Sequence, residues 1–342
     1  MHNDPTTKPG LSASKRQETE LVPWPNSIDN AMAHIHRRFQ QEGDMPSGLP
    51  TGLLNIDKAL DGLENSTLTV LGARPAMGKT SLAMNIAECV ALGTDITGRP
   101  LNTVHARPHP VAFFSIEMTQ EALTRRMLCG LAGVPAFKLN LETVDSQKAT
   151  QRLTHAASQL KSAPIYVDDT GALDVMEIRA RSRRMKKKYG IELIIVDYLQ
   201  LANCRDMAHQ GRQLEVAAIT AHLKAMAKEL KIPVLVLSQL SRAPELRGDR
   251  IGKPRLSDLR DSGAIEEDAD VVLLLRRPSR NPGDPEFEDK TLAIVDIAKH
   301  RNGPTGEVRL TFDEQLTRFG DRTQITDQAN PEPAKVPARE GV

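Results

Sequence analysis

Cysteine is scarce in this 342-residue sequence. The three cysteines, Cys89, Cys129 and Cys204, lie far apart and form no CxxC pair. This spacing argues against a disulfide framework or a cysteine-based zinc site, and it predicts reduced thiols in a cytoplasmic protein. Aromatic residues make up only 3% of the chain, with a single tryptophan. So few rings argue against a protein that binds nucleic acid by stacking bases on aromatic side chains.

Long apolar runs and a strong net charge are also missing. No stretch approaches the roughly 18 apolar residues of a membrane-spanning helix. The first residues, MHNDPTTKPGLSASKRQ, lack the apolar core of a signal peptide. We therefore expect no membrane partner. The formal net charge is +1, so any nucleic-acid binding must come from local patches rather than from the overall field.

The chain does contain an alternation of short apolar runs and helical patterns. Continuous apolar runs separated by helices predict an α/β fold, with a mostly parallel central sheet and helices on both faces. The last two runs are joined by a turn sequence, NGPTG, and predict a C-terminal antiparallel hairpin. The expected strands are TLTVLG (67–72), VAFFSI (111–116), PIYVDD (164–169), LIIVDY (193–198), PVLVLS (233–238), VVLLLR (271–276), LAIVDIA (292–298) and EVRLTF (307–312).

Composition divides the chain into four parts. Residues 1–25 and 323–342 are rich in proline and polar residues, and we expect a flexible arm and a disordered tail. Residues 48–322 hold the α/β domain, preceded by a helix and loop over 26–47. Apolar residues recur at helical spacing in that helix, which is compatible with packing on its own domain or on a neighbouring subunit. They are Ile28, Met32, Ile35 and Phe39.

A phosphate-binding loop follows the first expected strand. Its residues are Ala73, Arg74, Pro75, Ala76, Met77, Gly78, Lys79, Thr80 and Ser81. An amphipathic helix comes next, which is the strand–loop–helix context of a P-loop. Backbone N–H groups and the helix N-terminus form a concave anion site there. We expect Lys79 to reach the β- and γ-phosphates and the Thr80 hydroxyl to bind Mg²⁺, while Ala73 replaces the first glycine of the motif.

Three polar residues stand where other expected strands end. In parallel sheets this carboxyl edge is where ligands bind. Asp197 could complete the Mg²⁺ site, Glu117 could orient an attacking water toward the γ-phosphate, and Gln239 could sense that phosphate. Each also has a plainer explanation, which is a loop cap for Asp197, a helix start for Glu117 and a polar strand end for Gln239.

Two cations close the expected strand at 292–298. Lys299 and Arg301 are two residues apart, so on a continuing strand they point the same way. Asn302, Gly303 and Pro304 then give a turn signal. Two interpretations are open at this stage: solvated charges at a strand end, or a pair of cations aimed at one spot.

In their order along the chain, these motifs resemble the RecA-like motor domain of DnaB-type replicative helicases. The resemblance covers residues 48–320 and rests on GARPAMGKT, FFSIEM, IYVDD, LIIVDYLQL, VLVLSQLSR, LRDSGAIEEDAD and KHRNGPTGEVRLTF. It implies a RecA-like P-loop NTPase that hydrolyses ATP or another NTP with Mg²⁺. It also implies a homo-hexameric ring that moves along single-stranded DNA, typically 5′ to 3′, and unwinds forked DNA. Alanine at the first P-loop position is usual in this family.

The resemblance assigns roles within the nucleotide site. Lys79 and Thr80 correspond to the Walker A pair, and Asp197 to the Walker B aspartate. Glu117 corresponds to the catalytic glutamate and Gln239 to the sensor glutamine.

It also assigns roles outside that site. Arg301 corresponds to an arginine finger that acts on the neighbouring subunit, with Lys299 beside it. Arg260, Asp261 and Gly263 correspond to contacts with the DNA backbone, although the family usually has glutamate at the position of Asp261.

Only 47 residues precede the match, so we expect the family's separate N-terminal helical domain to be lacking. The helix within 26–47 stands where the family has a linker helix that packs on the adjacent subunit. A loader or a primase is a candidate partner. Two other functions are weighed: a recombinase-like or recombination-mediator DNA-dependent ATPase without unwinding, and a DNA-binding regulator that uses ATP only as an assembly switch. Glu117 argues against the regulator, and LRDSG with KHRNGP favours the helicase.

Overall fold

The protein is described by a computed structural model over residues 21–40, 46–101, 107–139, 146–205, 207–241, 252–259 and 262–322. The chain divides into two compact units, Met1–Gly43 and Asp44–Val342. Helix α1 (Trp24–Gln40) is the described element of the first unit. The apolar stripe of α1 is exposed, because Ile28, Met32 and Ile35 have exposed fractions of 46%, 44% and 42%.

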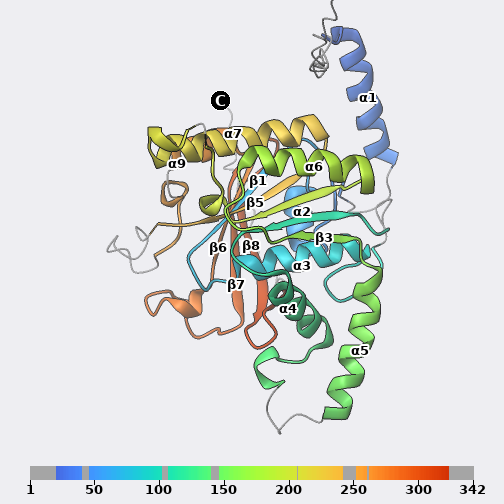
Figure 1. Ribbon diagram of the computed structural model, residues 1–342, viewed down its shortest axis with the longest axis vertical. Helices are drawn as coiled ribbons and strands as arrows, with labels where there is room; N and C mark the ends of the chain where they lie inside the picture. Colours follow the sequence, from blue (N-terminus) through green and yellow to red (C-terminus); the bar gives the residue numbers. More distant parts are fainter. Residues whose placement is uncertain are drawn as a thin grey trace, which may run out of the picture. The chain divides into compact units, whose positions relative to one another are not determined.

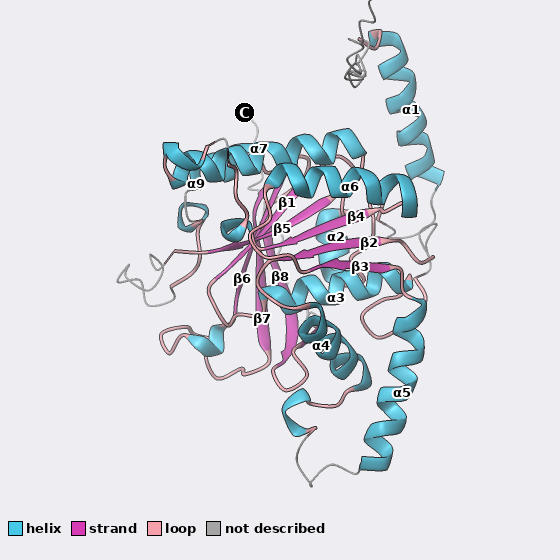
Figure 2. Ribbon diagram, viewed as in Figure 1, coloured by secondary structure: helices cyan, strands magenta, loops and turns pink. Residues whose placement is uncertain are grey.

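The second unit is built around one nine-stranded sheet, in the order β3-β2-β4-β5-β1-β6-β7-β8-β9 (Figure 2). The strands from β3 to β6 in this order run parallel, and β7, β8 and β9 continue the sheet antiparallel. The strands are β1 (Leu68–Ala73), β2 (Val111–Ser115), β3 (Ile165–Asp168), β4 (Leu193–Asp197), β5 (Val234–Gln239), β6 (Val271–Arg276), β7 (Leu292–His300), β8 (Gly306–Asp313) and β9 (Arg318–Asp321). The predicted mostly parallel sheet with a C-terminal hairpin is confirmed, and β9 adds a strand that the sequence analysis missed.

Helices cover both faces of this sheet. Figure 1 shows α6 and α7 along one face and α3 along the other. The helices of this unit are α2 (Leu54–Leu60), α3 (Lys79–Leu92), α4 (Gln120–Ala132), α5 (Ser146–Ser162), α6 (Val175–Tyr189), α7 (Arg212–Leu230) and α9 (Ser262–Asp268). Among the described residues, no helix combines the length and the apolar character needed to cross a membrane.

Two apolar cores, one on each face, explain why the central strands are apolar along most of their length, without alternation. Successive side chains of a strand point to opposite faces of the sheet. On β2, Phe113 packs into the core under α2 and α3, and the next residue, Phe114, packs into the core under α6 and α7. Leu235 and Val236 of β5 divide between the two cores in the same way. A strand buried on both faces shows no polar alternation.

The position of β1 determines where the P-loop lies. β1 runs parallel to β5 and β6 on its two sides, and its last residue, Ala73, is in register with Gln239 and Leu275. The P-loop therefore leaves the sheet at the carboxyl edge. Asp197, the last residue of β4, reaches the same edge one strand beyond β5.

A buried ion pair attaches β9 to the P-loop helix. Both terminal nitrogens of Arg318 donate to the Glu88 carboxylate of α3, at 3.2 and 2.8 Å, and one also donates to the carbonyl of Ile96 at 2.9 Å. The backbone N–H of Phe319 donates to Asn85 Oδ1 at 2.9 Å. Burial raises the pKa of Glu88, and Arg318 opposes that rise. These contacts keep Phe319 beneath the P-loop.

Replacing Arg318 with leucine tests this attachment. The Arg318→Leu change leaves a buried carboxylate without its cation, and we expect a loss of roughly 3–5 kcal/mol in the free energy of unfolding. Without its cation the folded-state pKa of Glu88 is raised further above the unfolded value. The folded state then binds the proton more tightly, so the loss is larger at about pH 8 than at about pH 5. Urea unfolding at both pH values measures it.

The double variant Glu88→Leu with Arg318→Leu is the control. It removes both charges, so it regains most of the lost stability. Equal destabilisation of the single and double variants would show that the apolar packing of β9, and not the ion pair, holds this strand.

Candidate active site

Where the P-loop meets α3, the backbone conformation and the close packing at Gly78 favour glycine. Gly78 lies between β1 and α3 with a φ of 99°. A Cβ at this residue would lie 3.0 Å from the ring of Phe319. Glycine adopts positive φ without the steric cost that a Cβ brings. Gly78 therefore lets the loop turn tightly over β9 and into the first turn of α3.

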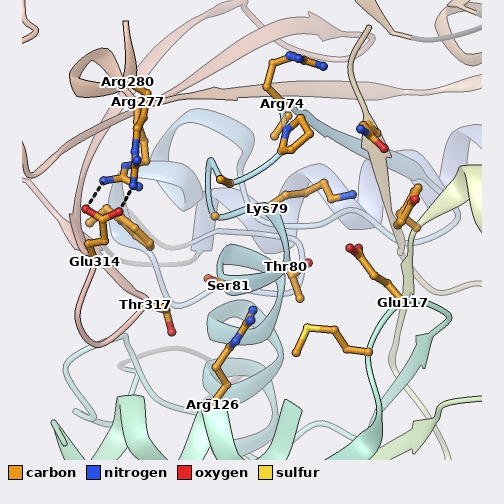
Figure 3. A pocket seen from close by; sticks show the side chains of 18 residues that line it. Arg74, Lys79, Thr80, Ser81, Glu117, Arg126, Arg277, Arg280, Glu314 and Thr317 are labelled. Atoms are coloured by element: carbon orange, nitrogen blue, oxygen red, sulfur yellow. Dashed lines mark hydrogen bonds and ion pairs between the residues drawn. The ribbon is translucent and has the colours of Figure 1, made fainter. Parts of the chain in front are cut away.

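A cavity of about 740 Å³ opens over this loop (Figure 3). Its lining includes most of the residues that the sequence analysis assigned to nucleotide binding. These are Ala73, Arg74, Pro75, Ala76, Gly78, Lys79, Thr80, Ser81, Glu117 and Gln239. It also includes Met118, Arg126, Tyr198, Arg277, Arg280, Phe312, Glu314 and Thr317. Met77 packs against the core between β1 and α3 instead.

Asp197 forms the buried acidic side of this site. The Thr80 hydroxyl donates to Asp197 Oδ2 at 2.8 Å, and Lys79 Nζ lies 3.7 Å from Oδ1 and 4.2 Å from the centre of the Tyr198 ring. Asp197 is fully buried, and its Oδ1 has no hydrogen-bond partner within the described residues. A buried carboxylate oxygen beside a threonine hydroxyl is a donor set that Mg²⁺ accepts.

Charge and burial act against each other in this pair. Burial raises the pKa of Asp197, and the Lys79 ammonium opposes the rise. Burial lowers the pKa of Lys79, and the Asp197 and Glu117 carboxylates oppose the fall. Each group thus stabilises the charged form of the other, as expected of a buried ion pair.

Glu117 enters the cavity from the end of β2, the strand beside β4. In Figure 3 its carboxylate lies on the side of Lys79 and Thr80 that is remote from Arg277 and Arg280. The Ser115 hydroxyl donates to the carbonyl of Met118 at 2.7 Å, and the N–H of Met118 donates back to Ser115 Oγ at 3.3 Å. These bonds fix the turn that presents Glu117.

A second glutamine, which the sequence analysis did not single out, holds Gln239. The Gln200 side chain accepts from the N–H of Gln239 at 3.1 Å, and its amide donates to Ser238 Oγ at 2.9 Å and to the Gln239 carbonyl at 3.3 Å. Gln200 therefore ties the segment after β4 to the end of β5. The signal in the sequence is its position three residues after Asp197.

Two arginines and a glutamate form the opposite end of the cavity (Figure 3). Arg277 is buried over the Phe312 ring, 4.4 Å from its centre, and lies 3.4 Å from the Glu314 carboxylate, which also pairs with Arg280. Burial lowers the pKa of Arg277, and Arg280 adds to this effect. Arg277 Nε has no hydrogen-bond partner among the described residues. The available signal was the run RRPSR at the end of β6.

The structure separates Lys299 and Arg301 from this cavity. Arg301 NH1 donates to Asp270 Oδ1 at 3.1 Å, at the start of β6, whereas the P-loop lies at the end of β1, the strand parallel to it. β1 alone spans roughly 17 Å. The two cations do lie together, since the side chains of both contact the end of α9. Within this chain they do not reach the P-loop.

The expected DNA-contacting residues are only partly described. Gly263 lies exposed in α9, with open space where a Cβ would be. Arg260 and Asp261 lie outside the described residues.

Fold and cavity define a P-loop domain in which the phosphate loop, an adjacent buried aspartate and a glutamate share one edge of a parallel sheet. The chain belongs to the DnaB-like helicase C terminal domain family, whose match covers residues 48–321. The resemblance inferred from the motifs is thereby confirmed.

Comparisons with individual proteins support this family assignment. The chain is 38% identical over 315 residues to the replicative DNA helicase DnaB of Leifsonia xyli subsp. xyli, a match covering 92% of this chain and 65% of that protein. The structure is similar to a solved ATPase domain, with a TM-score of 0.75, 29% identity and coverage of 86% of this chain and 98% of that one. It is also similar to a DnaB-like replicative helicase solved to study its interactions with primase, with a TM-score of 0.73, 30% identity and coverage of 86% and 67%. The chain thus spans less than two thirds of the length of the curated relative.

Substituting Gly78 tests the geometry of the loop. Gly78→Ala places a Cβ at positive φ and against Phe319, so the loop must shift and its N–H groups no longer converge on an anion. We expect nucleotide affinity to fall about ten-fold or more, equivalent to about 1.4 kcal/mol or more of binding free energy. Titration with a fluorescent nucleotide measures it.

Gly98→Ala is the matched control for backbone strain. Gly98 also has positive φ, 85°, but its Cβ would meet nothing within 4 Å. This change costs a similar amount of backbone strain and leaves nucleotide affinity unchanged. If both variants bind nucleotide equally well, the close packing of Gly78 has no role in the site.

Proposed function

We propose that this chain is the motor of a DNA helicase. It acts as a homo-hexameric ring that hydrolyses ATP or another NTP with Mg²⁺, moves 5′ to 3′ along single-stranded DNA and unwinds duplex at a fork. The observation that carries the proposal is the convergence of Lys79, Thr80 and Glu117 on one cavity, with the buried Asp197 bonded to Thr80 beside it, in a chain of the DnaB-like family.

The cavity suggests how a nucleoside triphosphate lies. The phosphates would sit over the P-loop N–H groups with Lys79 on the β- and γ-phosphates, and the γ-phosphate would point toward Glu117. The ribose and base would lie at the other end, near Arg277 and Glu314. A polar end whose buried Arg277 Nε lacks a hydrogen-bond partner among the described residues suits the hydrogen-bonding groups of a nucleoside.

Thr80 and Asp197 are the residues that would hold Mg²⁺. When bound, the ion neutralises charge that develops on the β- and γ-phosphates. Thr80 and Asp197 are already joined by a hydrogen bond at 2.8 Å. The protein therefore holds two oxygen ligands together beforehand, and little reorganisation is needed at binding.

Glu117 would prepare the attacking water. An exposed carboxylate on the γ-phosphate side accepts a hydrogen bond from water and orients its oxygen toward phosphorus. Gln239 ends the strand beside the P-loop and would contact the γ-phosphate from there. Gln200 restricts the backbone to which this side chain is attached.

The γ-phosphate would also need a cation on the side that faces away from the subunit's own P-loop. Arg301, with Lys299 beside it, would supply that charge to the next subunit. Arginine fingers contribute on the order of 10³–10⁵ in rate where they have been studied. A position remote from the subunit's own P-loop is what such a role requires.

DNA contact and assembly complete the proposal. Gly263 would bring its backbone close to DNA phosphates, together with Arg260 and Asp261. The motor domain would comprise residues 48–322, with the linker helix and loop over 26–47 ahead of it. The exposed apolar stripe of α1 would be covered by a neighbouring subunit. The related structure that includes primase interactions makes a primase a candidate partner, alongside a helicase loader.

Unwinding distinguishes this proposal from the recombinase-like alternative. We expect ATPase activity stimulated by single-stranded DNA, and displacement of the partner strand from a fork that carries a 5′ tail. Glu117→Gln keeps ATP and DNA binding but loses hydrolysis by about 100-fold or more, because a general base typically contributes 10²–10⁴. Stimulated hydrolysis without strand separation at any protein concentration would favour the recombinase-like ATPase instead.

Mixed assemblies test whether hydrolysis needs two subunits. Arg301→Ala should abolish hydrolysis while ATP binding and assembly stay intact, and Lys79→Ala should lose the P-loop function. In a mixture, a Lys79→Ala subunit offers its Arg301 to the intact P-loop of an Arg301→Ala neighbour, so some activity returns. Normal hydrolysis by Arg301→Ala alone would mean that the two cations are ordinary surface charges.

A further inference from the structure

The two cations proposed to act on a neighbour are held on their own subunit by the end of one helix. The Lys299 ammonium donates to the carbonyl of Glu266, and also to that of Glu267 at 3.4 Å. Arg301 NH2 donates to the Glu267 carbonyl at 3.3 Å. These carbonyls belong to the last turn of α9, where helix carbonyls have no intrahelical partner. Cations are favoured at such an end.

One buried carboxylate, that of Asp270, completes the set of groups that bind the two cations. Its Oδ1 accepts from Arg301 NH1 at 3.1 Å. Its Oδ2 accepts from the N–H of Leu68 at 2.8 Å and from the ammonium of Lys224 on α7. Asp270 itself is 5% exposed. Its backbone carbonyl also accepts from the N–H of Arg301 at 2.9 Å. Both the backbone and the guanidinium of Arg301 are thus bound by one residue.

These contacts hold the Arg301 guanidinium in place and still leave it accessible to solvent. The Arg301 side chain is 52% exposed, although one terminal nitrogen is bound to Asp270 and the other to Glu267. A free arginine side chain loses rotamer entropy when it is ordered. Anchoring it in advance reduces that cost when an anion arrives, which is the general advantage of preorganised groups.

Two like charges are brought together by the same arrangement. Burial lowers the pKa of Lys299, and the positive charge of Arg301 adds to this effect. The carboxylate of Asp270 and the carbonyls of α9 oppose the repulsion. These contacts allow the two like charges to lie close together.

We propose that Asp270 is a positioning residue for the arginine finger, which aims Arg301 at the nucleotide of the adjacent subunit. The inference rests on the proposed function, in which Arg301 acts between subunits. A plainer role exists: Asp270 also joins β1, β6 and α7, through Leu68 and Lys224, and could serve only to hold its own subunit together. The two roles differ in which subunit suffers when Asp270 is changed.

Mixed assemblies separate the two roles. Asp270→Asn keeps the size of the side chain and an acceptor for Leu68, but it removes the charge that holds Arg301. Alone, we expect its DNA-stimulated ATPase rate to fall about ten-fold or more, with ATP affinity and assembly unchanged. Mixed with Lys79→Ala subunits, its intact P-loop receives a correctly held Arg301 from the neighbour, and activity rises above that of either variant alone.

Lys224→Met is the matched control. It breaks the other ion pair of Asp270 and leaves the contact with Arg301, so we expect a rate within about two-fold of the unaltered protein, the scatter expected for a change outside the site. If Asp270→Asn does not fold, the combination of Asp270→Asn with Lys224→Met removes the unpaired buried ammonium and is tested in the same mixture.

The outcomes are distinct. Activity regained in the mixture supports the positioning role. If Asp270→Asn hydrolyses normally, or loses activity that the mixture does not restore while Arg301→Ala is restored, the positioning role is wrong and Asp270 acts within its own subunit. If Arg301→Ala is not restored either, hydrolysis is not shared between subunits. The proposed use of Arg301 then fails, and this inference fails with it.

Discussion

The register of β1 between β5 and β6 is the constraint on which the rest of the structure depends. β1 is buried on both faces, so a shift along its neighbours would leave the two cores unfilled. That register brings the end of β1 level with Gln239, and β4 brings Asp197 to the same edge. It also sets the start of β1 beside Asp270. The phosphate loop and the residue that holds Arg301 are therefore positioned by the same strand pairings.

The sequence already points to most residues of the candidate nucleotide site, because the signals for them are local. The P-loop occupies nine consecutive residues, and Glu117, Asp197 and Gln239 each follow an apolar run whose direction in a parallel sheet is known. The run RRPSR, by contrast, looks like a charged loop until β6 is paired with β1. β9 is only four residues long, and its contact with Glu88 spans 230 positions of the chain. Asp270 is the most difficult of these residues to predict, because an aspartate that precedes a strand can have many structural roles.

Buried carboxylates recur where two layers of this fold must be held together. Glu88 binds Arg318 between α3 and β9, Asp197 binds Thr80 and Lys79 between β4 and α3, and Asp270 binds Arg301 and Lys224 between the sheet and α7. Removing a charge from water is costly unless a partner and hydrogen bonds compensate. Each of these carboxylates has a cation and hydrogen bonds as compensation, but Asp197 keeps one oxygen without a hydrogen-bond partner within the described residues. The incompletely satisfied carboxylate is the one at the proposed metal site.

The separation of the phosphate loop from Arg301, taken with the proposed action of Arg301 on a neighbouring copy, would also limit how copies of this chain assemble. A two-fold dimer puts the same patch of two copies in contact, so it could exchange Arg301 only if that patch held both the P-loop and Arg301. A head-to-tail contact joins unlike surfaces, so it would bring Arg301 of one copy to the nucleotide of the next even where the two lie on separate faces. A repeated head-to-tail contact either closes into a ring or continues as a helical filament. In the proposed arrangement, the direction in which β1 runs through the sheet would give the assembly a polarity, with one donor and one acceptor at every site.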